Sequence, residues 1–150
     1  MKTLGCYDNS IIVIVGDHGE EFWDHGGVSH GHTLYDELVR VPLIVRYPKS
    51  VKGGSIVTEQ VSLLDLMPTL LGMARLPVPK ACQGESMQPL LVGKPERYAQ
   101  RPAFMETAAA KSLAGVRTPT QKIVQAKADA ALEMYALATD PREQTNLVNA

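Results

Sequence analysis

The sequence has 150 residues, of which 45% are hydrophobic and 21% are charged, and its formal net charge is -1. This length suffices for one domain with a hydrophobic core. The near-neutral charge excludes a strongly basic protein, so we expect neither nucleic acid nor an anionic membrane surface as a partner. No apolar run is long enough to cross a bilayer, and we predict no membrane segment in this chain.

An apolar strand followed by a long polar loop is predicted near the N-terminus. Residues Ile11 to Val15 are all β-branched, which favours a strand buried on both faces, as in a parallel sheet covered by helices. Gly16 ends this run, and Asp17 to Thr33 is rich in Gly, His and acidic residues. Because a long loop in a compact domain is commonly functional, we expect a site there. All four histidines of the chain lie in this loop.

A short helix, a second strand and a longer helix are expected next. The pattern predicts a helix over Leu34 to Val39 and a buried strand over Val41 to Val45. Ser62 to Ala74 has helical apolar spacing and a capping pattern at its start. Pro68 predicts a kink or a restart within it. Residues 76–95 contain several prolines and glycines and are expected to form a loop.

The tail predicts a small antiparallel sheet, because short apolar runs alternate there with turn signals. The expected strands are Ala103 to Glu106, Ser112 to Arg117, Gln121 to Ala126 and Leu132 to Leu137. The fold class is therefore α/β. We assign residues 1–100 to the α/β part and residues 101–150 to a small antiparallel subdomain. Ala108 to Ala110 is a small-residue joint within this second part.

The two cysteines, Cys6 and Cys82, have no CxxC or zinc-ribbon spacing. We expect two ordinary thiols, with a single disulfide as the alternative in an exported protein.

The histidine loop follows the carboxyl end of the first strand, where α/β sheets bind ligands. A carboxylate from Asp17 and an imidazole from His18 suit a divalent cation such as zinc, manganese or iron. A catalytic metal needs at least a third ligand, which could come from another histidine or acid of the loop. The candidates are Glu20, Glu21, Asp24, His25, His30 and His32.

Other roles for the loop residues are also open. Asp17 and His18 could instead form a local hydrogen-bonding pair, and a loop histidine could contact an anionic substrate or protonate a leaving group. Glu20 and Glu21 are expected to be solvated or to start a helix, and Phe22 and Trp23 to anchor the loop by packing. The residues alone therefore predict a metal or anion site.

Four motifs follow one another along the chain. The first is DNSIIVIVGDHGEEFWDHG, which is followed by HGHTLYDELVRVPLIV. The others are VSLLDLMPTLLGMA, QGESMQPLL and the terminal EMYALATDPREQTNL. In this order they resemble the second half of the sulfatase family, within the alkaline phosphatase superfamily. The resemblance extends from about Tyr7 to Leu147.

The resemblance implies part of an alkaline-phosphatase-like sheet flanked by helices, with a small C-terminal antiparallel sheet. It implies hydrolysis of sulfate esters on small molecules or glycans, or of phosphate and phosphonate esters in related branches. In such enzymes an activated nucleophile attacks sulfur or phosphorus while a divalent cation neutralises the oxygens. Calcium, manganese and zinc all occur in branches that this sequence resembles.

The resemblance also assigns roles to individual residues. Asp17 and His18 match the metal-binding pair of the family. His30 lies near the position that contacts the sulfate and the leaving oxygen, and we prefer it to His32 as the catalytic and substrate-binding residue. His25, in WDHGG, is expected to shape the loop first and to contact substrate second.

The sequence departs from the family in lacking the nucleophile motif C/S-x-P-S-R, whose first residue becomes formylglycine. Neither Cys6 nor Cys82 is followed by the required proline and arginine, and the family's two other acidic metal ligands also have no counterpart. We therefore expect a C-terminal fragment of a sulfatase-like hydrolase that is inactive by itself.

Alternative functions are a phosphodiesterase, phosphonate hydrolase or phosphotransferase of the same superfamily, or a non-catalytic metal-binding remnant. The N-terminal residues lack the apolar core of a signal peptide, although many relatives are periplasmic or extracellular.

Overall fold

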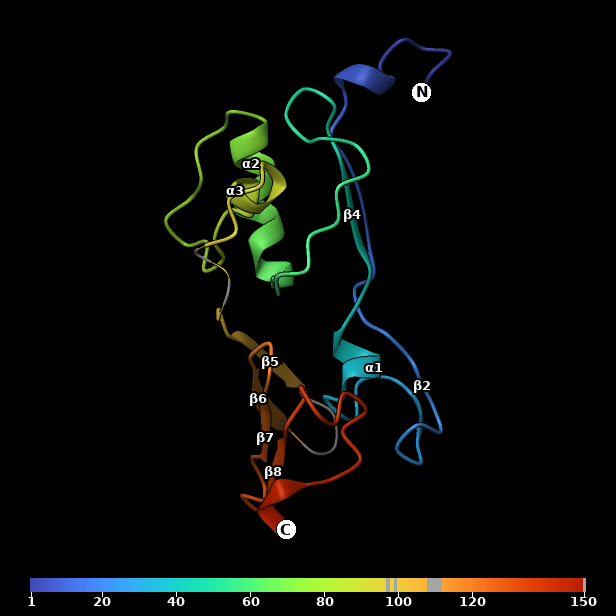
Figure 1. The fold of residues 1–150 in the computed structure, drawn as a ribbon, viewed down its shortest axis with the longest axis vertical. Coiled ribbons are helices and arrows are strands. Elements are labelled where there is room, and N and C mark those ends of the chain that lie inside the picture. Colours follow the sequence, from blue (N-terminus) through green and yellow to red (C-terminus); the bar gives the residue numbers. More distant parts are fainter. Residues whose placement is uncertain (97, 99, 108–111, 150) are drawn as a thin grey trace. The chain divides into compact units, whose positions relative to one another are not determined.

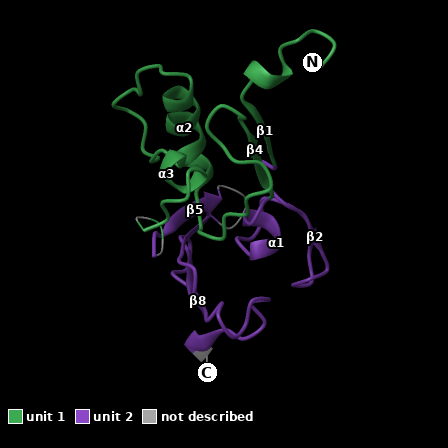
Figure 2. Ribbon diagram, turned by 45° about the horizontal axis from the view of Figure 1, so that its top comes forward, with its two compact units in different colours: residues 1–15, 42–99 green, residues 16–41, 100–150 purple. Residues whose placement is uncertain are grey.

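The computed structural model describes residues 1–96, 98, 100–107 and 112–149, which form two compact units (Figure 1). Unit 1 comprises Met1–Val15 and Pro42–Ala99, and unit 2 comprises Gly16–Val41 and Gln100–Ala150 (Figure 2). The histidine loop therefore shares a unit with the C-terminal sheet, whereas our sequence-based division placed it in the first hundred residues. The expected joint at residues 108–110 lies outside the described residues.

The two expected apolar strands of unit 1 are present, but they run antiparallel. β1 (Ile12–Val15) pairs with β4 (Leu43–Arg46), and Ile14 lies opposite Ile44 in this register. The predicted parallel sheet is therefore wrong for the described residues. A run of β-branched residues favours any strand with two apolar faces, and it carries no information on the direction of the partner strand.

The β1–β4 ribbon exposes apolar side chains to solvent, although its sequence is typical of a buried strand. Ile14 is 62% exposed and Ile44 is 59% exposed. Two strands alone cannot cover both faces of such a ribbon. Exposed contiguous apolar surface of this kind marks a site of association with another molecule or segment.

We expect the double substitution Ile14→Thr and Ile44→Thr to reduce binding of an apolar fluorescent dye and to reduce self-association. The cost in free energy of unfolding should be below about 1 kcal/mol, because threonine retains the β-branch and neither isoleucine is buried. Dye fluorescence and sedimentation velocity measure the first two effects, and urea denaturation measures the third. A loss of more than about 2 kcal/mol would mean that the pair is buried in solution.

The remainder of unit 1 contains η2 (Leu63–Asp65), α2 (Leu66–Met73) and α3 (Gln88–Leu91), with η1 (Tyr7–Asn9) near the N-terminus. The predicted capping box is present, since the Ser62 N–H donates to Asp65 Oδ2 at 2.9 Å and Ser62 Oγ accepts from the N–H of Leu64. The helix restarts at Leu66, two residues before Pro68, as predicted. α3 interrupts the stretch that we expected to be a loop.

The apolar spacing of Ser62 to Ala74 predicts one helix face with Leu63, Leu66, Met67, Leu70 and Leu71, and the structure buries none of these five side chains fully. Pro68, Thr69 and Met73 are buried, whereas Leu63 and Met67 are exposed. The fully buried Asp65 accepts a hydrogen bond from the N–H of Glu85 at 2.8 Å, and Thr69 Oγ1 accepts one from the N–H of Met87 at 2.7 Å. Polar contacts with the following loop therefore orient this helix within unit 1.

Unit 2 contains the four-stranded antiparallel sheet that the tail predicted. Its strands are β5 (Ala103–Thr107), β6 (Leu113–Arg117), β7 (Lys122–Ala126) and β8 (Leu132–Tyr135), in this order across the sheet. The same unit holds the short hairpin β2 (Glu21–Phe22) and β3 (Val28–Ser29), the helix α1 (Asp36–Val39) and η3 (Leu147–Asn149). The expected helix at residues 34–39 is therefore confirmed, and the histidine loop contains a hairpin.

Both cysteines are free thiols in the structure, as expected. Among the described residues, no helix has the length and apolarity that a membrane crossing requires.

Candidate functional site

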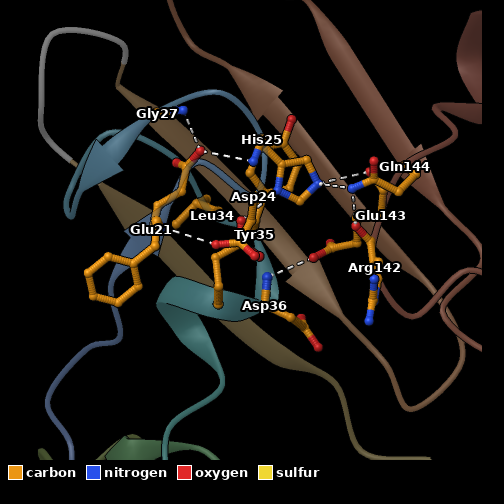
Figure 3. A network of polar contacts seen from close by, with 12 residues as sticks. Glu21, Asp24, His25, Gly27, Leu34, Tyr35, Asp36, Arg142, Glu143 and Gln144 are labelled. Atoms are coloured by element: carbon orange, nitrogen blue, oxygen red, sulfur yellow. Dashed lines mark hydrogen bonds and ion pairs between the residues drawn. The ribbon is translucent and has the colours of Figure 1, made fainter.

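The buried carboxylate of Glu21 organises the histidine loop. Glu21 is only 1% exposed. Its carboxylate accepts hydrogen bonds from the N–H groups of Gly27 at 2.7 Å and His25 at 3.1 Å (Figure 3). The same carboxylate lies 2.8 Å from Nε2 of His32. Burial alone would raise the pKa of Glu21, but the bonds from Gly27, His32 and His25 together lower it. Glu21 is therefore a structural anchor, and the expected solvated role is wrong.

The side chain of His25, which belongs to this loop, contacts α1 and the C-terminal segment of unit 2. Its side chain is 12% exposed, and its ring stacks on Tyr35 with centroids 3.6 Å apart. Nδ1 of His25 lies 2.5 Å from Glu37 Oε1. Its Nε2 lies 3.2 Å from the carbonyl oxygen of Glu143 (Figure 3). Both ring nitrogens thus have protein partners, and this geometry supports the expected role in shaping the loop. A substrate contact by His25 stays a prediction.

The protonation of His25 is expected to make stability depend on pH. Burial disfavours the charged ring, but the Glu37 carboxylate and the Glu143 carbonyl outweigh it and raise the pKa of His25. A raised pKa means that the stabilisation is fully present below the unfolded value of about 6.5 and is lost as pH rises through the folded value. We expect urea denaturation to show this fall above pH 6.5, and Glu37→Gln to weaken it. An identical profile in Glu37→Gln would contradict this assignment.

The metal and catalytic candidates lie together on the exposed side of the same loop. Asp17 follows β1 and is 91% exposed, with its Oδ2 3.8 Å from Nε2 of His18. The rings of His18 and His30 stack with centroids 3.8 Å apart. Nδ1 of His30 lies 2.6 Å from Oε1 of Glu20. Hydrogen bonds from the backbone N–H groups of Asp17 itself and of His18, with a smaller contribution from the neighbouring imidazoles, lower the pKa of Asp17 and favour its charged form.

The structure thus divides the predicted site residues into two groups. Asp17, His18 and His30 are brought together at the surface, whereas His25 and His32 contact the buried carboxylate of Glu21 or its neighbours. An oxygen and a nitrogen donor in adjacent exposed residues fit a divalent cation. The geometry therefore retains Asp17 and His18 as metal candidates and leaves the His30 ring accessible.

Two glycines permit this arrangement. The N–H of Gly19 donates to the carbonyl oxygen of Leu38 at 2.8 Å, and a Cβ at Gly19 would lie 1.9 Å from the carbonyl oxygen of Glu37. Gly31 adopts a φ of 82°, and its carbonyl oxygen accepts from Oγ1 of Thr107 at 2.5 Å. The loop is therefore fixed against α1 on one side of His18 and against β5 next to His30.

Unit 2 also contains a buried ionic cluster that the sequence analysis did not predict. Lys122 is fully buried, and its Nζ lies 2.6 Å from Asp36 Oδ1 and 2.7 Å from Glu143 Oε1. Arg117 donates to both oxygens of Asp36, at 2.9 and 2.7 Å. Glu143 Oε2 accepts from the N–H of Asp36 at 2.7 Å (Figure 3). These contacts join α1, the sheet and the C-terminal segment that support the loop.

The two aromatic residues of the loop do not anchor it. Phe22 is 75% exposed and Trp23 is 70% exposed. The prediction that they pack is therefore wrong for the described residues, because the ionic and hydrogen-bonded contacts of Glu21 and His25 hold the loop instead.

Comparison with known proteins agrees with the family resemblance that the sequence motifs indicate. A family model described as N-sulphoglucosamine sulphohydrolase, C-terminal, matches residues 24–150. An N-acetylglucosamine-6-O-sulfatase from Bacteroides thetaiotaomicron is 34% identical over 160 residues, which cover 98% of this chain and 28% of the relative.

Two solved structures extend this likeness to the fold. A complex with the substrate D-glucosamine-2-N,6-O-disulfate has a TM-score of 0.84 and 32% identity, over 98% of this chain and 31% of that one. Phosphonate monoester hydrolase of Agrobacterium radiobacter has a TM-score of 0.85 and 29% identity, over 99% of this chain and 32% of that one. The chain spans about a third or less of the length of these relatives. It therefore belongs to the sulfatase family, and it corresponds to the C-terminal region of that family.

Proposed function

We propose that this chain supplies the C-terminal wall of a site that hydrolyses sulfate esters. The observation that carries the proposal is the exposed group of Asp17, His18 and His30 on one loop of a sulfatase C-terminal region. The donor set of Asp17 and His18 would hold a divalent cation, for which calcium, manganese and zinc are candidates. When bound, such a cation neutralises charge on the oxygens of the ester.

In this proposal His30 is the catalytic residue of the chain. A half-exposed imidazole beside the cation site can donate a proton to the leaving oxygen or contact the anionic ester. Glu20 Oε1, 2.6 Å from Nδ1, fixes the ring and favours a proton on that nitrogen. His25 and His32 hold the loop through Glu37 and Glu21 and are proposed as secondary contacts with substrate.

The 150 residues contain no counterpart of the formylglycine nucleophile that sulfatases use. We therefore expect the chain alone not to hydrolyse an aryl sulfate. The assignment of residues 1–100 to the catalytic domain and of residues 101–150 to a separate subdomain is part of this proposal. The substrate class is a sulfate ester on a small molecule or glycan, as with the sulfated glucosamine bound by one relative.

A chimera tests the proposed function. The C-terminal region of the Bacteroides N-acetylglucosamine-6-O-sulfatase would be replaced by this chain, and hydrolysis of sulfated N-acetylglucosamine measured. We expect activity in the chimera and a loss of about 10²-fold or more in kcat on His30→Ala. The control is Thr58→Ala, on an exposed loop of unit 1. A folded but inactive chimera, or full activity of the His30 variant, would contradict the proposal.

Phosphonate hydrolysis is the second candidate, favoured by the TM-score of 0.85 to a phosphonate monoester hydrolase. A parallel chimera with the N-terminal part of that enzyme, assayed on a phenyl phosphonate ester, separates the two. Activity in only one chimera identifies the chemistry that this C-terminal region supports.

A further inference from the structure

We propose that Glu143 is a positioning residue for the histidine loop, and that it acts by holding the ring of His25 with a proton on each nitrogen. Glu143 belongs to the terminal motif EMYALATDPREQTNL, for which the proposed hydrolysis has no role. Both residues lie in unit 2. The consequence for catalysis rests on the proposed function, whereas the state of the His25 ring does not.

The partners of the His25 ring determine where its protons lie. Nδ1 faces a carboxylate oxygen of Glu37, and Nε2 faces the carbonyl oxygen of Glu143. A carbonyl oxygen and an ionised carboxylate only accept hydrogen bonds, so each ring nitrogen must donate. The amide nitrogen of Gln144 also lies 3.3 Å from Nε2, but it is a donor and bonds to the carbonyl oxygen of Arg142 at 3.0 Å. The ring is therefore an imidazolium cation whose Nε2 proton is bound by Glu143.

Glu143 is anchored by its own side chain on the side away from His25. The residue is 2% exposed, and its Oε1 lies 2.7 Å from Nζ of Lys122. Its Oε2 accepts from the N–H of Asp36 at 2.7 Å (Figure 3). Its φ of 54° lies in the left-handed region, which a residue other than glycine keeps only where the surrounding contacts enforce it. One residue thus connects the buried cluster, through its carboxylate, with the His25 ring, through its carbonyl.

The turn that contains Glu143 is braced by Asp140. The Asp140 carboxylate accepts from the N–H groups of Gln144 at 3.1 Å and Thr145 at 2.9 Å. The carbonyl oxygen of Asp140 accepts from the N–H of Glu143 at 3.2 Å. These bonds fix the direction of the Glu143 carbonyl from outside the buried cluster.

His25 transmits this constraint to the hairpin that carries the proposed catalytic residue. Its N–H donates to Oε1 of Glu21 at 3.1 Å, and Glu21 lies opposite Ser29 in the hairpin. Glu20 directly precedes Glu21, and His30 directly follows Ser29. A displaced His25 ring would therefore move the base of the hairpin and the imidazole of His30. Small errors in the position of a catalytic group reduce the rate strongly.

The ring protons of His25 in the unmodified 150-residue chain give the first test. Nitrogen-15 NMR at about pH 7, where a free imidazole is mostly neutral, should show both ring nitrogens of His25 protonated. The two N–H signals should be protected from exchange with solvent. A folded chain in which His25 is mostly neutral, with no proton on Nε2, would overturn the proposal.

Two substitutions and a control test the part played by Glu143. Glu143→Ala removes the anchoring carboxylate but keeps the carbonyl group, and the Nε2 proton of His25 should exchange at least about tenfold faster. Asp140→Ala loosens the turn from outside the buried cluster and should accelerate the same exchange about fivefold. The Nδ1 proton, held by Glu37, should be retained in both variants. The control Gln144→Ala removes the amide beside Nε2 and should change the exchange less than about twofold.

A general loosening of the fold would accelerate both ring protons equally, and this result would overturn the proposal. A larger effect of Gln144→Ala than of Glu143→Ala would also overturn it, because the amide would then hold the ring. Circular dichroism checks that each variant is folded. If Glu143→Ala does not fold, Asp140→Ala and the unmodified chain still decide the outcome.

The sulfatase chimera tests the consequence for catalysis. Glu143→Ala should lower kcat at least about tenfold and change KM less than about threefold, because Glu143 positions a catalytic group and does not bind substrate. An unchanged kcat would overturn the positioning role. An inactive chimera would overturn the proposed function and leave the ring-proton results unaffected, so the two proposals fail separately.

Discussion

Replacing Lys122 by methionine is expected to lower the free energy of unfolding by about 3 to 5 kcal/mol. Lys122 is fully buried, and its ammonium group pairs with Asp36 and Glu143 while donating to the carbonyl oxygen of Leu34 at 3.0 Å. Methionine matches the length of lysine, so the loss arises from the charge. Asp36 would then keep its pair with Arg117, whereas the buried carboxylate of Glu143 would lose the ammonium group that pairs with it.

The matched control for Lys122→Met is Lys127→Met in the same sheet region. Lys127 Nζ lies 3.0 Å from Glu106 Oε2, but both side chains are more than half exposed. Such a surface ion pair contributes little, and we expect a change within about 0.5 kcal/mol. Urea denaturation of both variants measures the difference. Equal effects of the two substitutions would show that the buried cluster is not formed in solution.

Substituting Gly19 by alanine is expected to cost about 3 kcal/mol and to detach the histidine loop from α1. The added Cβ would lie 1.9 Å from the carbonyl oxygen of Glu37 and 2.9 Å from its carbonyl carbon. These are backbone atoms of a helix, so they cannot move aside as a flexible side chain would. The hydrogen bond from Gly19 to Leu38 would be lost as the loop shifts.

Gly53→Ala is the control for this prediction. Gly53 lies in a turn of unit 1, and a Cβ there would have no neighbour within 4 Å. We expect a change within about 0.5 kcal/mol. Amide hydrogen exchange should locate the effect of Gly19→Ala in residues 17–32. Unchanged protection of those amides would mean that the loop does not depend on this close approach.

The antiparallel sheet of unit 2 could be predicted from the sequence because its signals are local. Each strand is an apolar alternating run bounded by turn residues, and short hairpins leave little choice of pairing. The antiparallel pairing of β1 with β4 could not be predicted in this way. Its strands are separated by the whole histidine loop, and a run of β-branched residues fits a parallel or an antiparallel neighbour equally well.

The candidate site was only partly predictable for a related reason. The grouping of histidines in one loop is visible in the sequence, and so is the pair Asp17 and His18. The burial of Glu21 and Lys122 is not, because charged residues are normally exposed and their partners come from distant segments. In β7, for example, Lys122 faces inward with Val124 while Ile123 is partly exposed, so the hydrophobic pattern alone does not orient the strand.

The contact between His25 and Glu143 has a consequence for biosynthesis. The two residues are 118 positions apart, which corresponds to roughly 6 to 24 s of translation at about 5 to 20 residues per second. The histidine loop therefore leaves the ribosome long before the residues that enclose it. During this interval it remains without its partners, and its closure waits until Glu143 has been synthesised. Contacts of such long sequence separation also slow folding. A ribosome stalled before Glu143 should consequently carry a loop that proteases cut readily.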